Sequence, residues 1–328
     1  MSSPTHVVGI DLGTSNCAIA FACLAEGGDA TLTDFPVPQL QRPGQISSQP
    51  LLPSCIYLPG EHELAAGATG LPWDAAPPHV VGEFARWQGS RVPGRLVASA
   101  KSWLCHPRSD PRKPLLPWGA VEGVEPISAV EATTRILQHL RHSWEHCPQG
   151  AGHPISEQQL TITLPASFDQ QARNLTIEAC RAAGLGHALL LEEPQAAFYN
   201  WISLRHSRWK EDLSQIQVAL VIDVGGGTSD FSLIACSSQG ESFDLKRLAV
   251  GRHLLLGGDN IDITLARTAE ASMSSGRQNL STSQWNLLCQ RVRQAKEHLF
   301  MEGGEESVTI RLPGSGLRLI GGLRQAVL

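Results

Sequence analysis

The sequence predicts an α/β protein built from two similar lobes. Short apolar strands alternate with helical segments along most of the chain, which is the pattern of an α/β fold. One unit, a strand followed by an Asp-Gly turn and a second strand, occurs twice, as Ile10-Asp11-Leu12-Gly13-Thr14 and as Ile222-Asp223-Val224-Gly225-Gly226. At 328 residues the chain also exceeds the usual size of one domain. We therefore expect lobes over 1–206 and 207–328 that face each other across a cleft.

Composition excludes several classes of protein. Hydrophobic residues make up 42% of the chain and charged residues 17%, which is typical of a globular protein with a core. A net charge of −5 argues against a nucleic-acid-binding surface, and no apolar run approaches the roughly 18 residues of a membrane helix. Residues 1–5 are polar and lack the basic start and apolar segment of a signal peptide. We expect a cytoplasmic protein without nucleic-acid or membrane partners.

The spacing of apolar residues assigns strands and helices to both lobes. Prolines crowd residues 35–126, which indicates a separate, loop-rich insert with one helix around 96–104. The other predicted strands are 7–10, 17–23, 160–164, 188–191, 218–222 and 231–236. The other predicted helices are 129–146, 170–183 and 193–204.

Each glycine-rich turn follows an apolar strand, as in a phosphate-binding site. Without Cβ atoms the backbone approaches closely, and its N–H groups can bind anionic oxygens. The chain has no GxxxxGKS or GxxxxGKT run, so a Walker loop is excluded. Each turn leads into another strand rather than a helix, which disfavours a dinucleotide-binding fingerprint. We expect the two turns to hold a triphosphate from both sides.

Four carboxylates fit a magnesium site near those phosphates: Asp11, Glu193, Asp223 and Asp230. Mg²⁺ prefers oxygen ligands and keeps several waters, so these acids can hold it through water. One of them can also orient the attacking water of phosphoryl transfer. A purely structural role stays open for two of these residues. Asp230 could simply be an acidic residue of a hairpin turn, and Glu193 could be an acidic residue at the start of a helix, where the helix dipole favours negative charge.

Several ordered runs carry a resemblance to a known family. They are Ile10-Asp11-Leu12-Gly13-Thr14-Ser15-Asn16, Leu164-Pro165-Ala166-Ser167-Phe168, Glu193-Pro194-Gln195-Ala196-Ala197, Ile222 to Asp230, Leu256-Gly257-Gly258-Asp259-Asn260 and Ala295-Lys296. In order and spacing they resemble the ATPase domain of the Hsp70 chaperones. The resemblance implies an actin-like ATPase fold with duplicated ribonuclease H-like lobes. It also implies four subdomains: IA over about 1–34 and 127–206, IB over about 35–126, an incomplete IIA over about 207–252, and IIB over about 253–328.

The resemblance also implies a site for ATP or ADP with Mg²⁺. It assigns phosphate contacts to five residues: Thr14, Ser15, Gly226, Gly227 and Thr228. The other residues of the nucleotide site would be Gly13, Gly225, Gly257, Gly258 and Lys296. Of these, Lys296 would lie beside the adenosine. It places Asp11, Glu193, Asp223 and Asp230 around Mg²⁺, with Glu193, Asp223 and Thr228 nearest the chemistry. Pro165 and Arg173 would relay the nucleotide state to a substrate-binding domain.

Two departures concern charged residues. The run Gly82-Glu83-Phe84-Ala85-Arg86 matches the place of the family's catalytic lysine, so we expect Arg86 to neutralise phosphate charge. Arginine is a planar fork rather than a compact point charge, so hydrolysis is expected to be slow or altered. Lys101 is the rival cation, which we interpret as structural. Arg293 and Glu297 stand where the family has an acid and an arginine around the adenosine.

A third departure is the position of the last motif. Ile320-Gly321-Gly322 resembles the family's late adenosine motif but follows Asp223 too closely, so we expect residues 308–320 to form a strand pair of subdomain IIB instead. The rest of subdomain IIA and the peptide-binding domain are then outside this chain. An unpaired sheet edge and an uncovered apolar face are expected to weaken ATP binding and promote self-association.

The leading hypothesis is an Hsp70-like nucleotide-binding domain that hydrolyses ATP slowly and controls a client-binding domain, with client proteins and co-chaperones as partners. One alternative is a nucleotide-sensing or interaction module that does not hydrolyse ATP. Two features favour it: Arg86 at the position of the catalytic lysine, and the end of the chain before the rest of subdomain IIA. Another is a small-molecule kinase of the same fold, which would need a catalytic aspartate where Glu193-Pro194 matches the chaperones.

Three histidines recur at helical spacing: His139, His142 and His146. They could form a metal-binding face. The same helix carries an apolar stripe and offers no carboxylate partner, so we interpret them as surface histidines.

Overall fold

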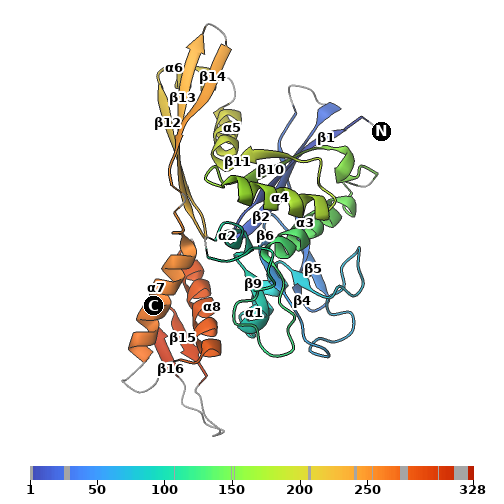
Figure 1. Cartoon of the computed structure of the whole chain (residues 1–328), viewed down its shortest axis with the longest axis vertical. Helices are drawn as coiled ribbons and strands as arrows, with labels where there is room; N and C mark the ends of the chain where they lie inside the picture. The colour runs from blue at the N-terminus through green and yellow to red at the C-terminus, as the bar shows by residue number, and fades with distance from the viewer. Residues whose placement is uncertain are drawn as a thin grey trace.

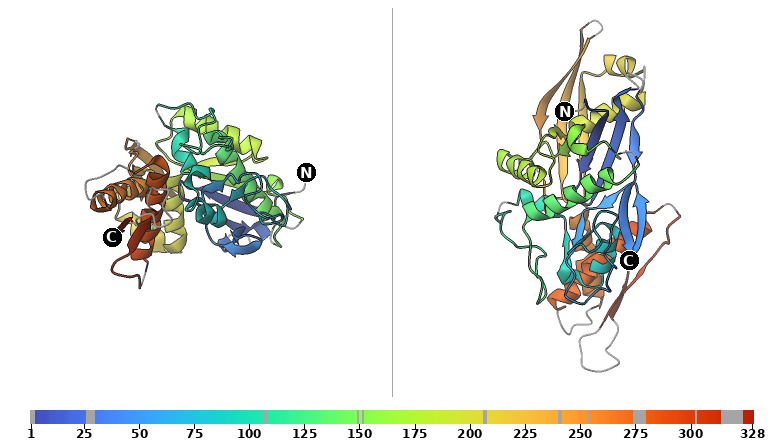
Figure 2. Two further views of the ribbon diagram at one scale, coloured as in Figure 1. Left: turned by 90° about the horizontal axis from the view of Figure 1, so that it is seen from below. Right: turned by 90° about the vertical axis from the view of Figure 1, so that its right-hand side faces the viewer.

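The computed structural model describes residues 3–25, 30–106, 108–148, 150, 152–205, 208–239, 242–252, 254–273, 280–301, 303–313 and 324–328. The elements from β1 to α5 form one body, called lobe I below, and the elements from α6 to β16 form a second, called lobe II. The two lie side by side along the long axis of the molecule (Figure 1), and the view from below separates them as well (Figure 2).

Lobe I is built on a six-stranded mixed sheet in the order β11-β10-β1-β2-β3, with β6 also pairing with β2. β1 runs parallel to β10, which runs parallel to β11, and β1 and β2 form an antiparallel hairpin around the first glycine turn. The strands are β1 (His6–Leu12), β2 (Asn16–Cys23), β3 (Thr33–Phe35), β6 (Leu52–Pro53), β10 (Gln159–Leu164) and β11 (Leu189–Glu192). The predicted strands of this lobe are confirmed.

The helices of lobe I are α3 (Ala129–Glu145), α4 (Gln170–Ala182) and α5 (Glu193–Arg205). Ser128 caps α3 by accepting a hydrogen bond from the Glu131 N–H at 3.0 Å, and Asp169 caps α4 in the same way from Ala172 at 2.8 Å. The apolar sides of α3 and α4 share one core with the sheet, in which Trp144 is fully buried. All three predicted helices are confirmed.

The proline-rich insert contains more strand than the sequence predicts. Its strands are β4 (Val37–Arg42), β5 (Gln45–Gln49), β7 (Cys55–Tyr57), β8 (Val80–Val81) and β9 (Leu96–Ala98); its helices are α1 (Glu83–Gly89), η2 (Pro93–Arg95) and α2 (Ala100–Leu104). The helix expected over 96–104 is present only in its second half, as α2. Leu96–Ala98 pairs with β7 as a strand, and Ser99, in the left-handed region, turns the chain into the short helix α2.

Lobe II has two parts. The first is an antiparallel sheet of β12 (Val218–Val224), β13 (Ser229–Gln239) and β14 (Ser242–Val250), preceded by α6 (Trp209–Ser214). The second contains α7 (Gly258–Met273), α8 (Thr282–Leu299), β15 (Thr309–Leu312) and β16 (Arg324–Val327), with its own apolar core. Lobe I and lobe II meet through α5, which packs on β12, and through η2, which packs on α8.

The strand pair expected over 308–320 is only half right. β15 lies inside that range, but its antiparallel partner is β16, which comes after it. Ile320-Gly321-Gly322 lies outside the described residues.

One face of β12 is apolar and exposed. Val218, Leu220, Ile222 and Val224 are each about half exposed or more, while Ala219 and Val221, between them, face the apolar cluster of α5 and α6. Across the ladder Leu220 pairs with Leu233 of β13, which is also exposed. Contiguous exposed apolar strands favour association with other apolar surfaces.

His139 does not lie on the surface as the sequence predicts. It is buried, its Nε2 lies 3.0 Å from the Pro38 carbonyl oxygen, and its ring packs edge-on against Trp73. The surface interpretation is therefore wrong for His139. Within the described residues, no three histidine, cysteine or carboxylate side chains lie close enough together to ligate a metal ion directly. None of the described helices has the length and apolarity needed to cross a bilayer.

We predict that replacing Leu220 and Leu233 together by threonine reduces self-association without loss of stability, because both side chains lie on the exposed face. Val221→Thr is the matched control, since it puts a hydroxyl on the packed face and should cost about 1 kcal/mol of unfolding free energy. Analytical ultracentrifugation and urea titration measure the two effects. Unchanged association in the double variant would show that this face does not drive it.

We also predict that stability falls in weak acid. Burial lowers the pKa of His79 and of His139 to about 4. Below pH 6.5 both imidazoles therefore bind protons in the unfolded chain, while in the folded chain they stay neutral until the pH approaches 4. The free energy of unfolding should fall by about 2 kcal/mol per histidine between pH 7 and 5. His139→Gln, which keeps a donor for Pro38, should flatten this dependence, whereas the exposed control His187→Gln should not. Equal slopes for both variants in urea titrations would contradict the assignment.

Candidate functional site

The two glycine turns face each other directly. The first joins β1 to β2 through Gly13, Thr14 and Ser15; the second joins β12 to β13 through Gly225, Gly226, Gly227 and Thr228. A Cβ atom at Gly226 would overlap the Ser15 hydroxyl, and one at Gly227 would overlap the Ser102 hydroxyl and come within 3.0 Å of Thr14 Cγ2. Any larger residue would force these side chains to shift, so the duplicated turns do meet between the lobes as the sequence predicts.

The start of α7 is bound to the second turn. The N–H of Gly258 donates to the Gly225 carbonyl at 3.1 Å, and the N–H of Asp259 donates to the Gly226 carbonyl at 2.7 Å. Gly225 in turn donates to the Thr228 carbonyl at 2.8 Å. Gly257 and Gly258 therefore belong to the same site as the second turn.

The four predicted carboxylates come from both lobes. Asp11, near the end of β1, accepts a hydrogen bond from the Thr163 hydroxyl at 2.6 Å. Glu193 is the first residue of α5. Asp223 and Asp230 lie opposite each other on β12 and β13, and Asp230 is buried.

Lys101 is the cation of this cluster. Its side chain is buried, and its ammonium forms an ion pair with the Glu193 carboxylate. Burial raises the pKa of Glu193 to about 7, against the opposing effect of Lys101, and the charges of Asp11 and Asp223 raise it further. The influence of both aspartates on Glu193 places three carboxylates and one ammonium within electrostatic reach of one another.

The structure does not bring Arg86 to this cluster. One end of its guanidinium lies 2.7 Å from Glu83 and the other 3.5 Å from Glu297 of α8. The structure thus places Lys101 rather than Arg86 beside the predicted carboxylates, because α2 carries Lys101 to Glu193 while α1 points Arg86 toward α8. The run from Leu96 to Leu104 is apolar apart from two serines and Lys101, and a lysine in such a run was the signal that could have identified it.

Lys296 and Arg293 form a separate charged network beside Gly258. Lys296 Nζ lies 2.6 Å from Asp262 Oδ1 and donates to the Gly258 carbonyl at 3.2 Å. Arg293 pairs with Asp262 at 2.7 Å and with Asp259. These contacts place Lys296 near the second turn, and both cations share the buried Asp262.

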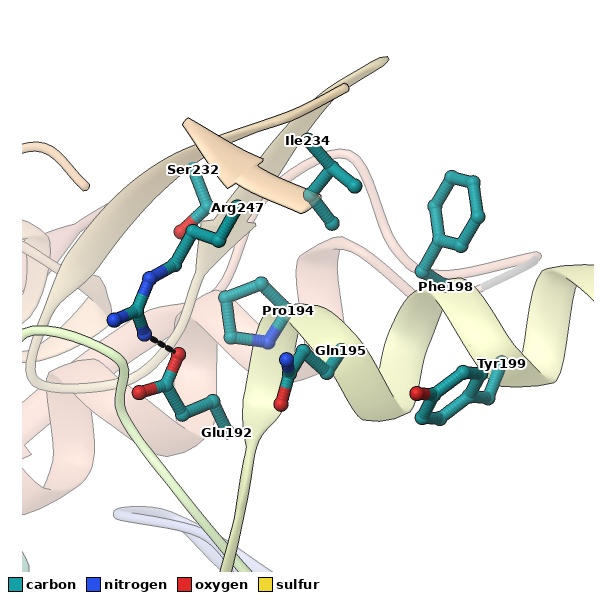
Figure 3. A pocket seen from close by; sticks show the side chains of 8 residues that line it. All are labelled: Glu192, Pro194, Gln195, Phe198, Tyr199, Ser232, Ile234 and Arg247. Carbon is teal, nitrogen blue, oxygen red and sulfur yellow. Dashed lines mark hydrogen bonds and ion pairs between the residues drawn. The ribbon is translucent and has the colours of Figure 1, made fainter. Parts of the chain in front are cut away.

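A third cluster joins the lobes at the last residue of β11, next to Glu193. Glu192 accepts from Arg173 of α4 at 2.8 Å and pairs with Arg247 of β14, so that one carboxylate bridges the two lobes. Figure 3 shows Arg247 and Glu192 at a pocket that is also lined by Pro194, Phe198 and Ile234. Pro165, the other predicted relay residue, is buried just after β10.

The residues present fit a magnesium–polyphosphate group. The side-chain oxygen of Ser102 is buried beside Gly227 and has no hydrogen-bond partner among the described residues, as expected for a hydroxyl that faces a ligand oxygen.

Comparison with known proteins agrees with this geometry. The family model described as "Hsp70 protein" matches residues 7–317. The "Chaperone protein HscA homolog" of Acinetobacter baumannii (strain AYE) is 28% identical over 320 residues, which cover 95% of this chain and 44% of that protein. The protein of the same name from Actinobacillus pleuropneumoniae serotype 5b (strain L20) is 32% identical over 271 residues, 79% of this chain and 36% of that protein.

This chain thus spans less than half the length of these curated relatives. The family match extends from β1 to beyond β15 and includes both glycine turns, Glu193 and Lys296. The chain belongs to the Hsp70 family and has its actin-like ATPase fold.

Proposed function

We propose that this chain binds Mg-ATP and Mg-ADP between its lobes, hydrolyses ATP slowly, and thereby controls a client-binding domain that lies outside the 328 residues. The observation that carries the proposal is the meeting of two glycine turns beside the Lys101–Glu193 pair. Opposed turns offer backbone N–H groups to a polyphosphate from both sides, and the buried ammonium supplies the positive charge that such a ligand needs. Client proteins and co-chaperones would be the partners of the complete protein.

The position of each residue in the site indicates its role in binding or hydrolysis. Thr14, Ser15 and the second turn would bind the phosphates, with Ser102 as an additional donor. Asp11, Asp223 and Asp230 would hold Mg²⁺ through water, and the ion would neutralise charge on the phosphates. Glu193, with a pKa of about 7, can accept a proton from an attacking water near neutral pH.

Lys101 weakens the case for a module that cannot hydrolyse ATP. One of the two grounds for that alternative was an arginine at the position of the catalytic lysine, and Arg86 instead pairs with Glu83 and Glu297. The compact ammonium of Lys101, which is paired with Glu193, is suited to neutralise charge on a phosphoryl group during its transfer. ATP hydrolysis is therefore the function that the geometry supports best.

We predict that nucleotide binding depends on Mg²⁺ and on Asp223. Titration calorimetry with ATP and ADP should show much weaker binding when EDTA replaces Mg²⁺. Asp223→Asn should weaken Mg-nucleotide binding more than Asp230→Asn, because Asp223 is the less buried of the pair and Asp230 is enclosed in the sheet. Metal-independent binding, or the opposite order of the two variants, would contradict this site.

We predict that Lys101, and not Arg86, supports hydrolysis. Lys101→Ala should lower the single-turnover rate by roughly 100-fold or more, the usual effect of removing a group that stabilises transition-state charge. Arg86→Gln, which removes a charge of the same sign outside the cluster, should change the rate less than about threefold. A larger effect at Arg86 than at Lys101 would restore the expectation drawn from the sequence.

A further inference from the structure

Ser99, just before α2, has a backbone that serine rarely adopts. Its φ of 54° and ψ of 31° lie in the left-handed region, where a non-glycine residue is unfavourable. A serine at the start of a helix normally caps it with its hydroxyl, but Ser99 makes no such bond to α2. The strained backbone and the missing cap indicate that the hydroxyl has another partner.

That partner lies in the other lobe. The Ser99 hydroxyl donates to Asp259 Oδ2 at 2.7 Å. Asp259 is in the first turn of α7, and its own N–H is bound to the Gly226 carbonyl of the second glycine turn at 2.7 Å. A continuous chain of two hydrogen bonds therefore connects the start of α2 to the turn that faces the phosphates.

The same short helix carries the groups that face the site. Lys101, two residues after Ser99, pairs with Glu193, and the hydroxyl of Ser102 is buried against Gly227. Ala100 and Leu104 anchor the opposite side of the helix in the core of lobe I. Because α2 has only five residues, the position of Ser99, the residue directly before it, influences where the ammonium and this hydroxyl point.

We propose that Ser99 is a positioning residue for ATP hydrolysis, which couples the closing of lobe II to the placement of Lys101. Its hydrogen bond to Asp259 forms when α7 and the second glycine turn stand against lobe I, and the bond holds α2 so that Lys101 and Ser102 face the phosphates. The inference rests on the proposed nucleotide site and adds a condition to it: the rate of the chemical step depends on a contact between lobes that does not touch the nucleotide.

Ser99→Gly is the decisive variant. Glycine adopts the left-handed backbone readily and removes the CH2OH side chain whose hydroxyl reaches Asp259, so the fold should be kept. The single-turnover rate should fall roughly tenfold or more, as expected when a reacting group is misplaced, while the Kd for Mg-ATP should change less than about threefold. Ser99→Asn, which also tolerates this backbone and offers an amide donor to Asp259, should keep most of the rate.

Two controls separate this role from a structural one. Ser90→Gly removes a hydroxyl that donates to Trp87 within the same insert, at 2.7 Å, and should leave the rate unchanged. In an Asp259→Ala background Ser99→Gly should have no further effect, because its partner is already gone. A wild-type rate in Ser99→Gly, or an undiminished effect without Asp259, would overturn the inference.

Failure of the proposed function itself would show elsewhere. Calorimetry and single-turnover hydrolysis on the unmodified 328-residue chain test the nucleotide site without reference to Ser99. Thermal melting of each variant confirms that it is folded before rates are compared. If the unmodified chain binds and turns over Mg-ATP while Ser99→Gly does so equally well, only the role of Ser99 is rejected.

Discussion

The pairing of Lys101 with Glu193 is the interaction on which the rest of the site depends. Burying an ammonium and a carboxylate costs more solvation than the pair usually returns, so the pair is a poor source of stability. Three carboxylates within electrostatic reach of one another would be still less favourable without a cation among them. Lys101 compensates this excess of negative charge, and as a compact ammonium it can turn toward an anionic ligand.

Contacts between the lobes are polar at both ends of the site. Ser99 reaches Asp259 on one side, and Glu192 joins Arg173 to Arg247 on the other. An apolar contact also joins the lobes, because Phe198 of α5 packs in one cluster with Ala219 and Val221 of β12. Single hydrogen bonds and ion pairs contribute little net free energy, whereas buried apolar surface contributes more. The contact of α5 with β12 is therefore the stable part of the interface, and the polar contacts at its two ends add specificity to it.

The sequence predicts the repeated features well and the long-range ones poorly. The strands of the sheet and both glycine turns follow from local pattern, because period-2 alternation and glycine conformational freedom act within a few residues. Which cation lies beside Glu193 does not follow from the local pattern. Arg86 and Lys101 both lie in short helices of the insert, and the tertiary path of α2 decides which one meets Glu193. His139 was misjudged for the same reason, since the segment that buries it is distant in sequence.

β12 carries the site and the exposed apolar face on alternate residues. Asp223 points to the half-buried side, while Ile222 and Val224 on either side of it are exposed. A strand has one backbone for both faces, so whatever packs on the outer side chains restrains the carboxylate and the glycine turn that follows. The rigidity of the second turn, and hence its fit to a phosphate, therefore depends on how the outer face of β12 is covered as well as on the residues that touch the ligand.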